Sequence, residues 1–242
     1  MRIGMRAESS QPLIVMDKVV RQVEGPRQQI KTLLQGVSWS LQPGERVAIV
    51  ARKRAEADAF LECACGVSPV QGGAVTIGAH VSWPLGKPEA LLGGVSARLN
   101  AEFLQRIYGD PHRRHEQMQI IRLLSDLELD YFDRPLRTYN SAMKARFRLA
   151  VSIVFDFDVY AVPSMDAWSF AAKSLRAQRF REVFELMTKN ASLLVANPDI
   201  NFQKAYCSHG LVLANGAIIY QGGIDHCHAM IGETSKKGEH AS

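Results

Sequence analysis

The stretch ERVAIVARKRAEADAFLECAC, residues 45–65, predicts a buried strand, a tight turn and a helix in direct succession. Many proteins hold phosphate between a strand and a helix, using the pattern G-x-x-x-x-G-K-[ST]. The same frame here begins at Ala51 and ends with Glu56, Ala57 and Asp58. This frame therefore stands in the place of a phosphate loop, and its chemistry has to be judged residue by residue.

The residue types that bind phosphate are missing from this frame. Glycines let such a loop approach the phosphates, while its lysine and hydroxyl reach the outer phosphates and magnesium. No glycine occurs between residues 45 and 65, and Ala57 and Asp58 stand in the lysine and hydroxyl positions. Glu56 adds a second carboxylate, and each negative charge near a triphosphate costs at least about 1 kcal/mol even in water-like surroundings. The sequence therefore predicts a phosphate loop that is in place but has lost its chemistry.

Two basic residues of the turn could partly compensate for these losses. Lys53 and Arg54 are the possible residual nucleotide contacts, although they lie at the turn rather than at the start of the helix. Asp58 could in principle ligate a metal ion. A solvated, charged turn without phosphate is the interpretation that these residue types favour, and no metal site is expected.

Composition places the chain among ordinary globular proteins and limits its partners. The 242 residues, 47% hydrophobic and 22% charged, suffice for one large domain with a well-buried core. No apolar run approaches the about 18 residues of a membrane span, and four cysteines without a disulfide framework are typical of the reducing cytoplasm. The net charge of +5 is spread over several helices without an aromatic stripe, so no nucleic-acid partner is expected.

Further along the chain, short apolar runs alternate with segments of helical periodicity, which predicts a largely parallel sheet covered by helices. A mainly helical insertion is expected between about residues 86 and 140, with helices near 96–109 and 112–128. Asn215 and Gly216, between two apolar runs, predict a hairpin turn.

Four segments carry a resemblance to a known family, and they keep its order and spacing. They are LLQGVSWSLQPGERVAIV (33–50), GVSPVQGGAVTIG (66–78), VSWPLG (81–86) and the segment from LELDYF to VYAVPS (127–164). On these residues the chain resembles the nucleotide-binding subunits of ABC transporters over nearly its full length, most of all those that export capsular polysaccharides or O-antigens. The resemblance implies an α/β fold with a P-loop NTPase-like ABC ATPase core, a mixed sheet flanked by helices, together with an antiparallel β subdomain and a helical subdomain.

The resemblance also implies how the chain is divided. Residues 1–242 are expected to form a single ABC ATPase-like domain. Its core, including the β subdomain, takes up about 12–85 and 155–230, and the helical and signature subdomain takes up 86–154. The ends of the chain, 1–11 and 232–242, are expected to be loose termini.

In this family, the strand after the signature helix should end in an aspartate that organises magnesium and a glutamate that polarises the attacking water. Pro163 and Ser164 stand there instead, and Asp166 lies three residues past the first of them. The glutamine that touches magnesium corresponds to Leu92, and the switch histidine corresponds to Asn197. The resemblance therefore implies a degenerate nucleotide site without a catalytic residue.

The signature motif, whose helix start caps a phosphate of the partner subunit, corresponds to NSAMK, residues 140–144. Ser141 persists there and Ala142 stands where glycine is usual, which makes this the least altered element. Both are possible residual nucleotide contacts, although a serine at a helix start is also simply a good N-cap. We predict an ATPase fold that does not hydrolyse ATP and needs no cofactor, with ATP and Mg²⁺ bound only if the altered site still holds them.

The expected function is that of a catalytically silent ABC-type subunit, structural or regulatory, in a polysaccharide export or assembly complex. Its expected partners are a membrane permease subunit, a second ABC ATPase subunit, or both, in a homo- or heterodimer. When the partner is an active subunit, Ser141 is expected to complete the partner's ATP site. Its expected location is cytoplasmic, peripheral on the cytoplasmic face of the inner membrane. Two alternatives stay open. One is a weak ATPase or nucleotide sensor that uses Lys53, Arg54 and Asp166, and the other is a binding module outside transport that holds an acidic glycan or another protein.

Two further groups of residues have both a structural and a functional interpretation. The cysteines and histidines near the C-terminus are of the types that bind zinc, but their spacing matches no closed four-ligand pattern. The tryptophans are expected to be core or interface anchors, with Trp83 and Pro84 just before a region that by resemblance faces the membrane subunit. The residues concerned are Cys207, His209, His226, Cys227 and His228 in the first group, and Trp39, Trp83 and Trp168 in the second.

Overall fold

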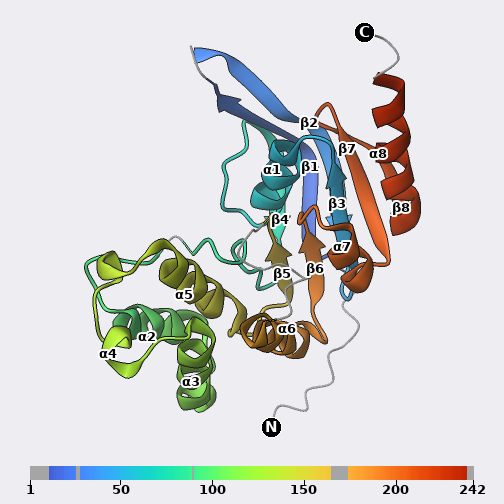
Figure 1. Cartoon of the computed structure of the whole chain (residues 1–242). Coiled ribbons are helices and arrows are strands. Elements are labelled where there is room, and N and C mark those ends of the chain that lie inside the picture. Colours follow the sequence, from blue (N-terminus) through green and yellow to red (C-terminus); the bar gives the residue numbers. More distant parts are fainter. Residues whose placement is uncertain (1–10, 26–27, 89, 165–173, 239–242) are drawn as a thin grey trace.

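The structure of the protein is a computed structural model, which describes residues 11–25, 28–88, 90–164 and 174–238. Its strands form two sheets, and most of its helices gather in a lobe beside them (Figure 1). This arrangement is the α/β fold that the resemblance implied, with a mixed sheet, an antiparallel sheet and a helical part.

The smaller sheet is antiparallel and has the strand order β2-β1-β4. Its middle strand β1 (Ile14–Glu24) pairs with β2 (Ile30–Leu41) on one side and with β4 (Gly72–Ile77) on the other. At the start of β1, Ile14 and Met16 are buried because alternate residues of a strand point to the same face. One face of this sheet therefore contributes to the core.

The larger sheet has the strand order β5-β6-β3-β7-β8. Its first four strands are parallel, and β8 closes the edge as the antiparallel arm of a hairpin. The parallel strands are almost wholly buried, which explains why they occur in the sequence as unbroken apolar runs. In chain order the strands are β3 (Arg46–Ala51), β5 (Val159–Val162), β6 (Ser192–Val195), β7 (His209–Ala214) and β8 (Ala217–Gly223).

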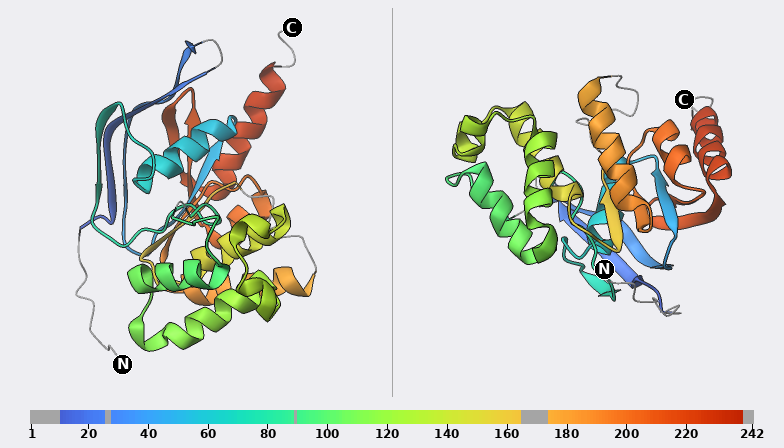
Figure 2. Two further views of the ribbon diagram at one scale, coloured as in Figure 1. Left: turned by 90° about the vertical axis from the view of Figure 1, so that its left-hand side faces the viewer. Right: turned by 90° about the horizontal axis from the view of Figure 1, so that it is seen from below.

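Helix α1 (Arg54–Ala64) lies between the two sheets, as Figure 2 shows from the side. Phe60 and Leu61 are fully buried, and the ring of Phe60 meets the edge of Trp39 from β2 at 5.2 Å between centroids. Trp39 therefore anchors the core, as the sequence predicted. The position of α1 also fixes the turn that precedes it, because that turn joins α1 to the central strand β3.

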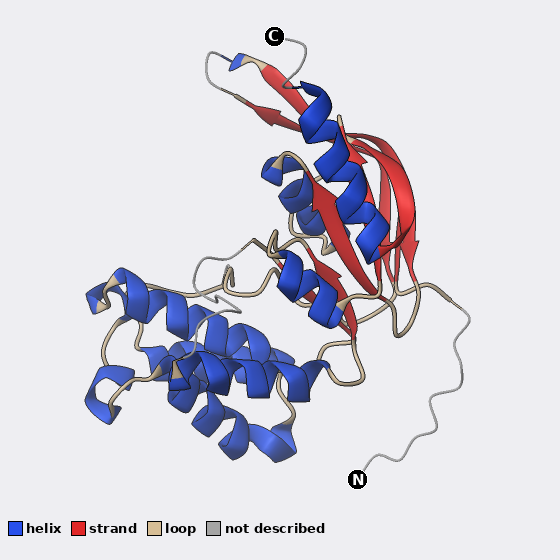
Figure 3. Ribbon diagram, turned by 45° about the vertical axis from the view of Figure 1, so that its right-hand side comes forward, coloured by secondary structure: helices blue, strands red, loops and turns tan. Residues whose placement is uncertain are grey.

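The helical lobe gathers apart from the strands, as Figure 3 shows. Within it α3 packs against both α2 and α5. The last five residues of α5, 149–153, are buried, with Val151 and Ile153 in the same apolar cluster as Val162 of β5, so this helix ties the lobe to the larger sheet. The helices of the lobe are α2 (Ala97–Tyr108), α3 (Arg114–Ser125), α4 (Leu129–Phe132) and α5 (Ser141–Ile153), with the 3-10 helices η2 (Pro111–Arg113) and η3 (Leu136–Thr138).

Three helices complete the fold: α6 (Leu175–Thr188), α7 (Ile200–Tyr206) and α8 (Ile224–Gly238). The expectation of a loose end from residue 232 is wrong as far as Gly238, because α8 continues to that residue. Among the described residues, no helix has both the length and the apolar character that crossing a membrane requires.

The hairpin turn predicted at Asn215 and Gly216 is confirmed. Both residues have positive φ, 52° and 77°, as a two-residue turn between twisted strands requires. The carbonyl of Gly216 accepts a hydrogen bond from the backbone N–H of Gln35 at 2.8 Å, so the turn also connects the larger sheet to β2 of the smaller one.

Candidate nucleotide-site region

The turn between β3 and α1 is much shorter than a phosphate loop. β3 ends at Ala51 and α1 begins at Arg54, so only Arg52 and Lys53 lie between them. A phosphate loop keeps most of its pattern outside the helix, where backbone N–H groups can cradle the phosphates. Here residues 54–58 of the frame are already helical. The predicted succession of strand, tight turn and helix is therefore confirmed, and its turn has only two residues.

Residue types explain why this segment winds into a helix. The run RAEADA after Lys53 alternates alanine with charged residues, and alanine has the highest helix propensity. No residue between Gly44 and Gly66, a range that the structure describes in full, has a positive φ. The backbone N–H of Glu56 donates to the carbonyl of Lys53 at 2.8 Å, so it is used within the first turn of the helix. A glycine-free loop has thus become regular helix.

The charges at the start of α1 are paired with one another. The Nζ of Lys53 lies 3.4 Å from Oε1 of Glu56, whose side chain is only 4% exposed. A carboxylate in the first turn is favoured by the positive end of the helix dipole. Glu56 is therefore a buried carboxylate whose charge is paired with Lys53 at the helix start.

Arg54 connects the helix start to the end of β5. Its Nη2 donates to the carbonyl oxygen of Ser164 at 2.9 Å, and its Nε lies 3.8 Å from Oδ2 of Asp58. The Oδ1 of Asp58 is buried and has no hydrogen-bond partner in the described part of the chain. Burial raises the pKa of Asp58 above its usual value, while Lys87 and Arg54 act in the opposite direction. Both predicted residual cations of the turn are therefore held by the chain itself.

Comparison with known proteins gives relatives of one kind. A polysialic acid transport ATP-binding protein, KpsT of Escherichia coli, is 30% identical over 188 residues, which cover 75% of this chain and 82% of the relative. This chain belongs to the ABC transporter ATP-binding proteins of capsular polysaccharide export. The ATP-binding protein BexA of Haemophilus influenzae is 29% identical over 208 residues, covering 85% of this chain and 92% of BexA. No family model matches the chain.

Solved structures of ABC cassettes share the fold. The dimeric ATP-binding cassette MJ0796 bound to ADP and phosphate superposes with a TM-score of 0.66 at 14% identity, covering 87% of this chain and 98% of that one. An ATP-binding subunit of an ABC transporter superposes with a TM-score of 0.67 at 17% identity, covering 91% and 93%. At these identities the likeness concerns the fold alone.

The other altered ABC positions are occupied by residues with structural contacts. Pro163 and Ser164 are buried at the end of β5, where the ABC family has its magnesium-organising carboxylates. Asn197, at the switch-histidine position, is buried, and its side chain accepts from the backbone N–H of Asp199 at 2.9 Å. Leu92, at the glutamine position, has an exposed side chain. Asp166 lies outside the described residues.

The signature segment differs from the start of α1 because its helix start is exposed. Asn140 is the N-cap of α5, and its side-chain oxygen accepts from the backbone N–H of Met143 at 2.9 Å. Ser141 and Ala142 are the first helical residues, and both are exposed. The interpretation of Ser141 as the cap of this helix is therefore wrong. A clue was present in the sequence, because Asn140 is an equally good N-cap residue.

The cysteines and histidines near the C-terminus are dispersed. Burial raises the pKa of Cys207 to about 12, so its thiol stays protonated. The His226 ring lies 4.8 Å from the ring of Tyr220. Across the residues that the structure describes, no three of the types His, Cys, Asp and Glu come together as a metal site. Trp83 is partly buried, packs against the core and donates to the hydroxyl of Ser152 at 2.7 Å, and Trp168 lies outside the described residues.

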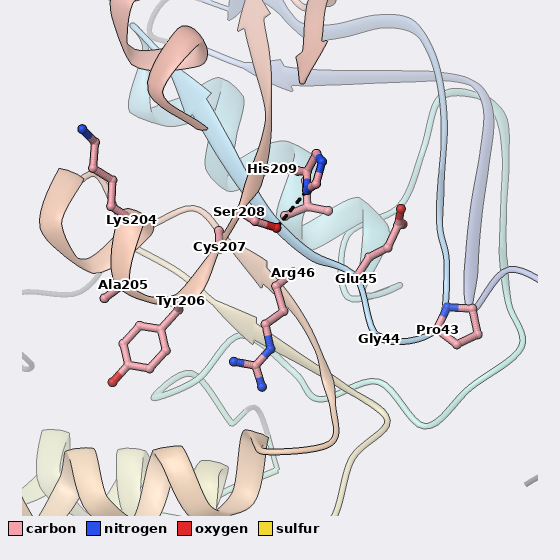
Figure 4. A pocket seen from close by; sticks show the side chains of 11 residues that line it. Pro43, Gly44, Glu45, Arg46, Lys204, Ala205, Tyr206, Cys207, Ser208 and His209 are labelled. Atoms are coloured by element: carbon pink, nitrogen blue, oxygen red, sulfur yellow. Dashed lines mark hydrogen bonds between the residues drawn. The ribbon is translucent and has the colours of Figure 1, made fainter. Parts of the chain in front are cut away.

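A cavity of about 690 Å³ opens at the opposite end of β3 from the helix start, and Figure 4 shows its lining. Polar side chains that line it make hydrogen bonds within the chain. Arg46 donates to the carbonyl of Lys189 at 3.2 Å, and Tyr206 donates to Glu185 at 2.9 Å. His209 shares a hydrogen bond of 2.8 Å with the hydroxyl of Ser208. We therefore assign no role in nucleotide binding to this cavity.

Proposed function

We propose that this chain is a catalytically silent ABC subunit of a polysaccharide export complex, which neither binds nor hydrolyses ATP in its own nucleotide site. The observation that carries the proposal is the start of α1. Residues that would line a phosphate loop are helical there, and the side chains of Lys53 and Arg54 are paired with Glu56, Asp58 and the carbonyl of Ser164. A triphosphate would have to break these contacts before it could bind.

The proposed role is structural or regulatory. The chain docks on a membrane permease subunit, pairs with a second ABC ATPase subunit, or does both, on the cytoplasmic face of the inner membrane. The exposed start of α5 supports pairing, because Ser141 and Ala142 are accessible and their helix start favours an anion held by a partner. In a heterodimer the active partner would carry the catalytic carboxylates, and this chain would supply the helix start.

The first test is titration calorimetry of the full chain with MgATP, together with a phosphate-release assay. We expect no binding at the α1 site up to millimolar ATP and no release of phosphate. The double variant Lys53→Ala/Arg54→Ala serves as the matched control. Micromolar binding in the wild type that this variant abolishes would overturn the proposal and favour the weak ATPase or nucleotide sensor.

The second test concerns the partner. The chain is mixed with a catalytically active ABC subunit of the same export system, and phosphate release is measured with the wild type and with Ser141→Arg. We expect a heterodimer whose phosphate release depends on this chain and falls with Ser141→Arg, since a bulky cation would obstruct the helix start. Activity of the partner that is the same with or without this chain would argue against the composite site.

A further inference from the structure

A second cavity, of about 270 Å³, lies between the loop at residues 91–95, η3 and α5. We call it the α5 cavity. Leu136 and Phe147, both buried, and Leu91 are its apolar lining residues. None of residues 51–58, and neither Ser141 nor Ala142, lines it. The α5 cavity is therefore separate from the start of α1, and it shares only Lys144 with the signature segment at residues 140–144.

The charged residues that line the α5 cavity are all cations: Arg137 of η3, and Lys144 and Arg148 of α5. No carboxylate of the described residues lines it. Within the described ranges of the chain, none of these three side chains takes part in an ion pair or a hydrogen bond. Lys144 and Arg148 are four residues apart on one helix, a spacing at which like charges repel. The positive charge of this cavity is thus left uncompensated.

The walls of the α5 cavity are held in position by backbone hydrogen bonds. The N–H of Arg137 donates to the carbonyl of Gly93 at 2.7 Å, and the N–H of Leu136 donates to that of Val95 at 3.0 Å. On the other side of the loop, the Asn100 side chain bonds both the N–H and the carbonyl of Leu92, at 2.8 and 3.1 Å. The cavity is therefore formed before any ligand arrives, which reduces the ordering cost of binding.

We propose that the α5 cavity binds a small phosphorylated molecule, with its phosphate on Arg137, Lys144 and Arg148 and its non-polar part on Leu136 and Phe147. A guanidinium matches phosphate oxygens in a bidentate manner, and an ammonium adds a compact charge. A phosphate ester carries close to two negative charges, which suits a group of cations better than a single carboxylate does. The volume is at the small end for ligand sites, which favours an inorganic phosphate or a small ester over a nucleotide.

The test is titration calorimetry of the full chain with sodium pyrophosphate, inorganic phosphate and glucose 1-phosphate at low salt. We expect millimolar or tighter binding of at least one of these probes. Lys144→Ala and Arg148→Ala should each weaken it at least tenfold, and Arg148→Lys should weaken it less. The matched control is Arg122→Ala, which removes an exposed cation of α3 outside the cavity and should leave binding unchanged.

Three results would overturn the proposal. The first is that no soluble probe binds up to 10 mM, which is about the weakest affinity that calorimetry resolves, roughly 3 kcal/mol. The second is that Arg122→Ala weakens binding as much as Lys144→Ala and Arg148→Ala do. The third is that the chain binds only to vesicles of phosphatidylcholine with phosphatidic acid and to none of the soluble probes. Thermal unfolding of each unliganded variant shows that the fold is intact. The proposal does not depend on a silent α1 site. Binding of ATP in the α5 cavity can be told apart from binding at the start of α1. Binding in the cavity would be lost in Arg148→Ala and kept in Lys53→Ala/Arg54→Ala.

Discussion

The start of α1 and the start of α5 are both segments that face nucleotide in ABC proteins, yet their charges are arranged in opposite ways. At α1, Lys53 is paired with a buried Glu56, and Arg54 is bound to the end of β5. At α5 the first residues are exposed, and Lys144 and Arg148 have no partner in the described part of the chain. The start of α1 is therefore held by contacts within the chain, whereas the start of α5 is exposed.

This contrast concerns electrostatics at the helix starts and leaves the packing beneath them intact. Both helices carry a fully buried phenylalanine, Phe60 on α1 and Phe147 on α5. Each belongs to a different one of the two apolar clusters of the core. The two helix starts therefore differ in how their charges are paired and are alike in the burial of the phenylalanine beneath them. The following predictions test this separation of charge from packing, beginning with the largest effect.

Substituting the two buried phenylalanines should cost similar amounts of stability. We expect Phe60→Ala and Phe147→Ala each to lower the free energy of unfolding by about 3–5 kcal/mol, because each leaves a cavity in a packed core. Urea denaturation measures both. The control is Leu99→Ala at an exposed position of α2, with a change within about 0.5 kcal/mol. A much smaller loss for Phe60→Ala would mean that the two regions differ in packing as well.

The helix start of α5 should depend on Asn140 and be independent of Ser141. Asn140→Ala removes the side chain that accepts the Met143 N–H and should cost about 1 kcal/mol. Ser141→Ala should change the free energy of unfolding by less than about 0.5 kcal/mol, because Ser141 is exposed and does not cap the helix. The same urea series measures both variants. The reverse order of losses would restore Ser141 as a structural residue and weaken its proposed role at a partner's site.

Neutralising Glu56 should destabilise the chain by a moderate amount. Glu56→Gln removes the carboxylate that interacts with the start of α1, and we expect a loss of about 0.5–1 kcal/mol in low-salt chemical denaturation. The matched control is Glu116→Gln, whose exposed pair with Arg113 should contribute only a few tenths, about 0.2–0.5 kcal/mol. If Glu56→Gln gained affinity for MgATP without losing stability, the helix start would be a masked nucleotide site rather than a closed one.

The smallest expected effect is a pH dependence at Asp58. Burial raises the pKa of this carboxyl, so the folded chain holds the proton at pH values where the unfolded chain has already released it. Stability contributed by Asp58 is therefore lost as the pH rises through the raised pKa. We expect Asp58→Asn, which cannot ionise, to gain stability relative to the wild type between about pH 4 and pH 7. Unfolding free energies at both pH values measure this, and a relative loss at pH 7 would mean that the pair with Arg54 dominates.

Much of the fold could be predicted from the sequence because its signals are local. Unbroken apolar runs such as SLLV mark the buried strands, and Asn215-Gly216 marks the hairpin. The strand, tight turn and helix around the start of α1 were predicted as well, because residues 54–59 favour helix. The cue was RAEADA, which contains good helix formers and no glycine.

The α5 cavity is less accessible to sequence reasoning. Lys144 and Arg148 are one helical turn apart, which the periodicity of α5 indicates, but Arg137 joins them only through the hydrogen bonds that hold η3 to the loop at Gly93. That none of the described carboxylates lines it is a property of the folded surface. Pairing of Arg54 with the end of β5 likewise joins residues that are remote in the sequence.

The position of β3 in the larger sheet also bears on how the chain is synthesised. Arg46 pairs with Leu193 and Val47 pairs with His209, so the central strand leaves the ribosome long before either of its neighbours. The smaller sheet, by contrast, is built from strands that are all made early. During most of translation β3 can therefore pack against α1 but has no neighbouring strand. Such late, long-range pairing slows folding and leaves apolar surface open to chaperones in the meantime.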